Sequence, residues 1–165
     1  MASRYDHRQL SPLGALFVLI GGGLVVATTG PEEAWVATLL WVVAAIFALC
    51  ALSFWSLRVQ IETEHLRASF GPLPVFRKKI PLAQIERVEV GKTDLLDGWG
   101  IHFVPGRGWT WNLWGFRCVV LTLTDPSGRK KQPRTFRLGS DEPEELHAAL
   151  QRAVPSANRT DSLTE

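Results

Sequence analysis

Apolar residues are distributed in two different ways along this chain. Within residues 13–57 they form two long runs, and the only charged residues there are Glu32 and Glu33. Within residues 58–154 apolar and polar positions alternate over short segments that glycine and proline interrupt. The first pattern is typical of membrane-spanning helices, and the second of short half-buried strands. The sequence therefore predicts a membrane anchor, residues 1–57, followed by one soluble domain.

The second apolar run, residues 34–57, carries no charge. A helix of about 24 residues is roughly 36 Å long, enough to cross a hydrocarbon core of roughly 30 Å. A buried helix of a soluble domain would be shorter and amphipathic. The first run, residues 13–29, is near the lower length limit for a span. Because Arg4 and Arg8 precede it, a signal peptide is the alternative.

The residues between the two runs, 30–33, predict a tight turn and hence a transmembrane helical hairpin. Basic residues flank the hairpin on both outer sides and are absent from this turn. The positive-inside rule then places both termini in the cytoplasm, as a multi-pass protein of the cell membrane. Small residues on each helix predict close helix–helix packing, namely Gly14, Gly21 and Gly22 on the first and Ala44, Ala48 and Ala51 on the second.

The soluble domain, residues 58–154, reads as a series of strands followed by one helix. Eight alternating segments lie near residues 57–62, 66–70, 75–80, 88–90, 99–103, 109–113, 119–124 and 136–138. The pattern then changes, with apolar positions at Leu146, Leu150 and Ala153, which predicts an amphipathic helix. The polar residues 155–165 are expected to be a disordered tail.

Several short motifs occur among these strands. They are Gly98-Trp99-Gly100-Ile101, a glycine- and tryptophan-rich segment, Val119-Val120-Leu121 and Asp141-Glu142-Pro143. In this order they resemble bacterial pleckstrin-homology-like (PH-like) domains attached to two-helix membrane anchors. The resemblance implies an α+β fold, in which the transmembrane hairpin precedes a PH-like antiparallel β-barrel or sandwich. Seven or eight strands would form it, capped by the C-terminal helix. The resemblance implies membrane attachment but no activity.

Four tryptophans fall within a short stretch of the domain. Trp99, Trp109 and Trp111 share strand faces with apolar residues, which favours a place in the core. An exposed groove for a peptide or acyl chain is the alternative. Trp114 lies off this pattern and is the best candidate for an exposed contact with a protein or the bilayer.

Two basic clusters are candidates for contact with anionic lipid or a protein partner. They are Arg77, Lys78 and Lys79, and Arg129, Lys130 and Lys131. Near an anionic leaflet each cation contributes about 1 kcal/mol. Ordinary solvated strand and turn residues are the alternative. A phosphoinositide site like that of eukaryotic PH domains needs basic residues on the first hairpin, where this chain has Glu62 and Glu64.

Catalytic chemistry is not indicated. Asp94, Asp97 and His102 form the best acid–base group, but no nucleophile, metal-ligand spacing or phosphate loop accompanies them. Cys50 and Cys118 are expected to be unpaired, in a reducing compartment. The sequence therefore favours a binding module with no cofactor, metal or nucleic-acid partner and no enzymatic activity. A structural or assembly subunit of a larger membrane complex is the alternative.

Overall fold

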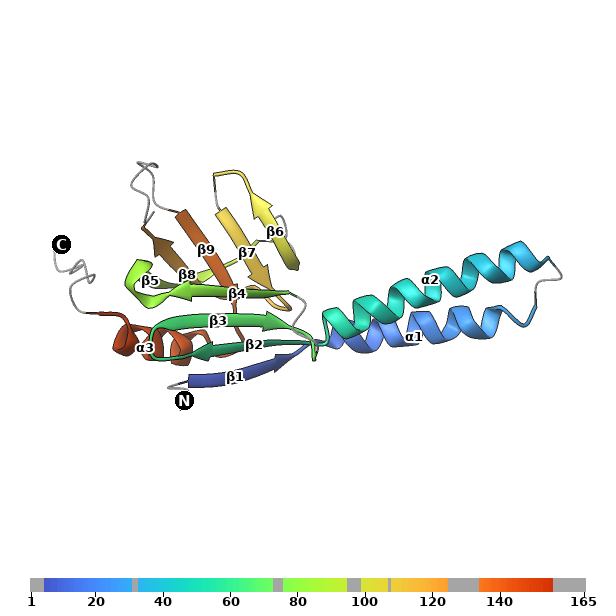
Figure 1. Cartoon of the computed structure of the whole chain (residues 1–165), viewed down its shortest axis with the longest axis horizontal. Coiled ribbons are helices and arrows are strands. Elements are labelled where there is room, and N and C mark those ends of the chain that lie inside the picture. The colour runs from blue at the N-terminus through green and yellow to red at the C-terminus, as the bar shows by residue number, and fades with distance from the viewer. Residues whose placement is uncertain are drawn as a thin grey trace.

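The computed structural model of the chain describes residues 5–30, 33–72, 76–94, 99–106, 108–124 and 134–155. Two helices stand out side by side from one end of a β-rich domain (Figure 1). The domain contains two sheets with nine strands in all, and its C-terminal helix packs on the second sheet. The architecture is α+β, as expected. The described residues of the last predicted segment end at Pro155, and the rest of that tail lies outside them.

The helical hairpin consists of α1 (Pro12–Ala27) and α2 (Ala34–Ser53). The Ser11 hydroxyl caps α1 by accepting from the backbone N–H of Leu13 at 3.1 Å. Among the described residues, α2 is the one helix long and apolar enough to cross a membrane, and only 11% of its most apolar stretch is buried. A core helix of a soluble protein would instead be covered on its apolar side.

Both helices end earlier than the predicted spans, residues 13–29 and 34–57. After α1, the hydroxyls of Thr28 and Thr29 donate to the carbonyls of Val25 and Val26, which turns the chain. After α2, residues 56 and 57 already belong to a strand. The strand pairing of these last residues therefore overrides the helical tendency of the apolar run.

Small residues form the contact between the two helices. Gly14 and Gly21 are buried on α1, as are Ala44 and Ala51 on α2. This confirms the predicted packing at these positions. The prediction is wrong at Gly22, where a side chain would meet nothing within 4 Å, and at Ala48, which is exposed. Close backbone approach through small residues is the usual way in which apolar helices associate in lipid.

Replacing Gly14 by leucine is expected to push the start of α1 away from Trp55, at the base of the hairpin. A Cβ atom at this position would lie 2.8 Å from Trp55 Cε3 and 3.3 Å from the Trp55 backbone. The measurement is thermal unfolding in detergent micelles, with an expected loss of roughly 1–3 kcal/mol from overpacking. Gly23→Leu is the matched control, since a Cβ at Gly23 has open space around it. Equal effects of the two substitutions would contradict the packing.

The first sheet, sheet A, has the order β1 (Tyr5–Leu10), β2 (Ser56–Ile61), β3 (His65–Phe70) and β4 (Arg77–Pro81). The sequence did not predict β1. Because β1 and β2 are antiparallel neighbours, the whole helical hairpin occupies the connection between them. At the base of the hairpin the Ser11 N–H donates to the Trp55 carbonyl at 3.1 Å. Both ends of the hairpin are therefore fixed to one sheet.

The second sheet, sheet B, has the order β5 (Ile85–Lys92), β8 (Arg117–Leu123), β9 (Arg134–Gly139), β7 (Gly108–Asn112) and β6 (Gly100–Val104). A short 3₁₀ helix, η1 (Leu82–Gln84), links the two sheets. Strands β7 and β9 pair in parallel, so the predicted wholly antiparallel arrangement is wrong at this pair. The predicted count of seven or eight strands is also wrong, because β1 adds a ninth.

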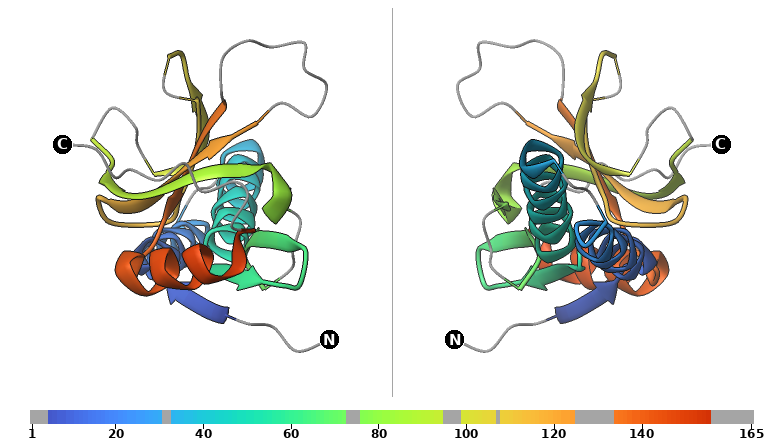
Figure 2. Two further views of the ribbon diagram at one scale, coloured as in Figure 1. Left: turned by 90° about the vertical axis from the view of Figure 1, so that its left-hand side faces the viewer. Right: turned by 90° about the vertical axis from the view of Figure 1, so that its right-hand side faces the viewer.

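The core lies between the sheets and beneath α3 (Pro143–Ala153), which runs along the end of the domain away from the hairpin (Figures 1 and 2). The largest fully buried apolar side chains of the core come from both sheets, from the β7–β8 turn and from α3, namely Leu57, Ile61, Leu66, Phe70, Ile85, Leu113, Val119, Leu121, Leu138, Leu146 and Leu150. The predicted apolar positions Leu146 and Leu150 thus face the core, as expected for the amphipathic C-terminal helix.

Strand β1 is also held to the start of α3. His7 Nε2 lies 2.7 Å from Asp141 Oδ1, and His7 Nδ1 lies 3.2 Å from Glu142 Oε2. Tyr5 packs against the core beside these carboxylates. Burial, followed by the charges of Glu142, Glu145 and Asp141, raises the pKa of Tyr5 to about 12. These contacts join the strand that leads into α1 to the C-terminal helix.

Alkaline pH is expected to release β1. The pKa of Tyr5 is higher in the folded protein than its ordinary value of 10.0, so folding favours the protonated phenol. Its stabilising contribution is complete below pH 10 and is lost as pH rises towards about 12. Hydrogen exchange of the β1 amides, compared between the native chain and Tyr5→Phe, measures this. The alkaline loss should be smaller in Tyr5→Phe, and an identical loss in both would exclude the phenol.

Candidate membrane-facing site

Five exposed aromatic residues surround the base of the hairpin, and we call them the aromatic collar: Trp55, Phe76, Trp99, Trp114 and Phe116. Each side chain is between 39% and 45% exposed. They come from the connection between α2 and β2, from the segments next to β4 and β6, and from the β7–β8 turn. Because tryptophan and other aromatic rings favour the membrane–water boundary, this surface suits contact with a bilayer.

Direct contacts join the aromatic collar to the hairpin. The rings of Trp99 and Trp114 lie 4.5 Å apart, and the Trp114 carbonyl accepts a hydrogen bond from Gln9 Nε2 at 3.2 Å. On the other side, Phe54 stacks on Phe76 with centroids 6.3 Å apart. A Cβ at Gly100, next to Trp99, would lie 3.7 Å from the Phe54 ring. The collar therefore lies at the end of the domain from which the helices emerge.

The predicted positions of the tryptophans are partly correct. Trp111 is 7% exposed and belongs to the core, and Trp114 is exposed, both as expected. The core assignments of Trp99 and Trp109 are wrong, because these side chains are 43% and 49% exposed. Trp109 does pair with Phe136 on the core side of sheet B. Sheet A leaves this part of sheet B partly uncovered.

An apolar groove opens where the edge strand β4 of sheet A approaches β6 and β7 of sheet B. It has a volume of about 270 Å³, and its walls are Phe76, Arg77, Lys78, Ile101, Trp109, Trp111 and Phe136. The groove is aromatic on the sheet B side and basic on the β4 side. Strands β4 and β6 are both at sheet edges, so their outer backbone groups are available to an added strand.

The predicted basic cluster on β4 is divided between two faces. Lys78 lies opposite Ala68, on the core side, and lines the groove. Arg77 and Lys79 lie opposite Ser69 and Arg67 on the outer face of sheet A, and Arg77 also reaches the rim of the groove. The alternation of side chains along a strand causes this division. The second predicted cluster, Arg129, Lys130 and Lys131, lies outside the described residues.

The candidate acid–base group does not form a site among the described residues. His102 pairs with Thr110 on the face of sheet B opposite the core, and its Nε2 is buried without a hydrogen-bond partner there. Asp94 is exposed at the end of β5, and Asp97 lies outside the described residues. Within the described ranges, no three His, Cys, Asp or Glu residues are close enough to hold a metal ion.

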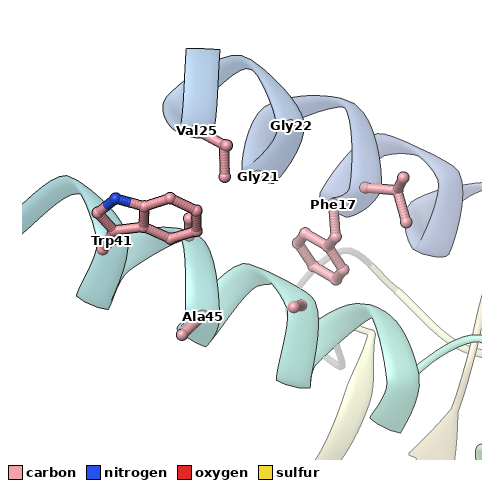
Figure 3. Close-up of a pocket in the computed structure, with 9 residues that line it drawn as sticks. Phe17, Gly21, Gly22, Val25, Trp41 and Ala45 are labelled. Carbon is pink, nitrogen blue, oxygen red and sulfur yellow. The ribbon is translucent and has the colours of Figure 1, made fainter. Parts of the chain in front are cut away.

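A second apolar cavity, of about 370 Å³, lies along the middle parts of α1 and α2 (Figure 3). It extends past Gly21 and Gly22, and its walls also include Phe17, Val18, Val25, Trp41, Ala44, Ala45 and Ala48. In Figure 3 the rings of Phe17 and Trp41 lie between the two helices. A lipid chain or another apolar helix suits the chemistry of this cavity.

Comparison with models of known protein families and with curated protein sequences finds no match for this chain.

Proposed function

We propose that this protein is a membrane-anchored binding module, in which α1 and α2 both cross the cell membrane and the termini are cytoplasmic. The β-domain is PH-like and binds lipid headgroups or a protein partner at the inner membrane face. The observation that carries the proposal is the aromatic collar around the base of an exposed apolar hairpin. An aromatic surface beside two apolar helices is favourable where it meets a bilayer.

The length of α1 supports contact between the collar and the bilayer. Its 16 residues span about 24 Å, less than a hydrocarbon core of roughly 30 Å. A short helix is accommodated when the membrane thins or when flanking residues move towards it. When the aromatic collar lies at the membrane interface, residues that flank α1 have moved towards the membrane. This follows because both ends of the hairpin are fixed to sheet A.

The apolar groove beside β4 is the site where we expect a protein partner. An extended peptide would add to an edge strand and place its apolar side chains against Trp109 and Phe136. The alternative function, a structural subunit of a larger membrane complex, would instead use the helix surfaces around the cavity of Figure 3.

Photo-crosslinking in cells distinguishes these functions. A photoreactive residue replaces Trp109 in the groove, Leu39 on the exposed surface of α2, or Arg152 on α3 as the control position. The binding module predicts a discrete protein or lipid adduct at position 109 that is absent at 152. Adducts at position 39 alone would support the structural subunit and contradict the binding module.

A further inference from the structure

The outer face of sheet A carries an unusual concentration of cations. Its strand register brings together five basic side chains from all four strands: Arg8, Arg58, Arg67, Arg77 and Lys79. A hollow of about 280 Å³ lies among them, and we call it the arginine hollow. It is lined by Arg8, Arg58, Gln60, Arg67, Ser69, Gly71 and Pro72.

Several of these cations are direct cross-strand neighbours. Arg8 lies opposite Arg58, and Arg67 lies opposite Lys79. Directly opposed side chains have Cβ atoms about 4.5–5.5 Å apart, at which like charges destabilise a sheet. Such an arrangement becomes favourable when an anion lies between the cations. The pairing of arginine with arginine therefore points to a ligand with negative charge.

The carboxylates of this face neutralise only part of the charge. Asp6 accepts from Arg58 Nε at 2.8 Å, which lowers the pKa of the Asp6 carboxyl. Arg67 Nη1 lies 3.8 Å from Glu62. Among the described residues, Arg8 has no ion-pair partner, and Arg67 Nε is buried without a hydrogen-bond acceptor. The hollow therefore retains unused donors from two arginines.

The depth of the hollow indicates where such an anion would come from. Arg8 precedes the α1 cap, Ser11, by three residues, and Arg58 follows Trp55 by three. Three strand residues span roughly 10 Å. Strands β1 and β2 continue away from the helices along the direction of the hairpin (Figure 1). The headgroup layer is about 5–7 Å thick on each side of a bilayer. The long side chains of Arg8 and Arg58 can reach this layer.

We propose that the arginine hollow binds the phosphate group of an anionic membrane lipid. The guanidinium groups of Arg8 and Arg67 donate paired hydrogen bonds to the phosphate oxygens, and the Ser69 hydroxyl lies at the same hollow. This inference rests on the proposed function, because it requires the collar end of the domain to face the bilayer. The inference specifies an anionic lipid phosphate as the headgroup ligand, which the proposed function left open.

The test uses the full chain in nanodiscs of phosphatidylcholine with or without phosphatidylglycerol. Native mass spectrometry measures the phosphatidylglycerol that the protein retains. The double substitution Arg8→Gln/Arg67→Gln should lower this retention by roughly thirtyfold, as expected for two cations at an anionic surface. Arg87→Gln/Arg152→Gln, which removes the same charge from distant exposed positions, should leave it unchanged.

Two further arms identify the ligand. Arg8→Lys/Arg67→Lys keeps the charge but removes the planar fork, so retention should again fall. Full retention in this variant, or equal loss in the control, would show diffuse attraction and overturn the proposal. The NMR resonance of Arg67 Nε–H should not shift when glycerol phosphate is added to phosphatidylcholine nanodiscs. It should shift when the nanodiscs contain phosphatidylglycerol. The reverse result would assign the hollow to a soluble phosphate. Crosslinking at position 109 is unaffected by these outcomes, so the proposed function is judged separately.

Discussion

Replacing Phe70 by alanine is expected to destabilise the β-domain by about 3–5 kcal/mol. Phe70 is fully buried, and its ring lies 5.6 Å from that of Phe54 and 5.5 Å from that of Trp111. It therefore connects the end of α2 with both sheets. Its removal leaves a cavity at the junction between the hairpin and the domain, where the rings of Phe54 and Trp111 lose a packing partner.

Chemical denaturation of the full chain in micelles measures this effect. Strand signals should be lost at lower denaturant in Phe70→Ala, while the helical signal of the hairpin persists. Phe103→Ala is the control, because Phe103 is 57% exposed and its truncation should change little. If the two variants unfolded at the same denaturant concentration, Phe70 would not be the junction described here.

Removing two rings of the aromatic collar, in Trp99→Ala/Trp114→Ala, is expected to release the base of the domain from the bilayer. Indole side chains bury about 150–250 Å² each when fully covered, so two half-exposed rings contribute roughly 2–4 kcal/mol of membrane contact. The hairpin should still insert, because neither residue lies in α1 or α2. The hairpin and the domain would then tilt together relative to the bilayer, because both ends of the hairpin are fixed to sheet A.

Energy transfer from a dye on α3 to dyes in the lipid headgroups measures the position of the domain. The double variant should show a broader distribution of distances than the native chain. Phe103→Ala/Trp109→Ala removes two exposed aromatic residues outside the aromatic collar and should keep the native distribution. Broadening of similar size in both variants would assign the effect to altered folding rather than to lost membrane contact.

The sequence predicted those features that depend on local periodicity. The charge-free run predicted α2, and the alternation at residues 57–62 predicted β2. Strand β1 was missed because its sequence, YDHRQL, is polar and its one buried side chain is Gln9. It forms a strand only because the hairpin returns β2 beside it, which is a long-range effect.

The candidate site was harder to predict for the same reason. Alternation placed Trp109 on the core side of its strand, but could not show that sheet A leaves this side partly open. The arginine hollow joins Arg8 to residues about fifty positions later in the chain. No local pattern brings them together, because their proximity depends on the pairing of β1 with β2 across the inserted hairpin.

The central claim, that the collar end of the domain lies at the bilayer surface, is tested most directly by depth measurement. Spin labels are placed singly at Phe116 in the aromatic collar and at Arg152 on α3, in the full chain reconstituted in liposomes. The label at position 116 should be relaxed by lipid-soluble oxygen and protected from a water-soluble nickel complex, and the label at 152 should behave oppositely. Equal accessibility of both positions to the nickel complex would contradict the claim.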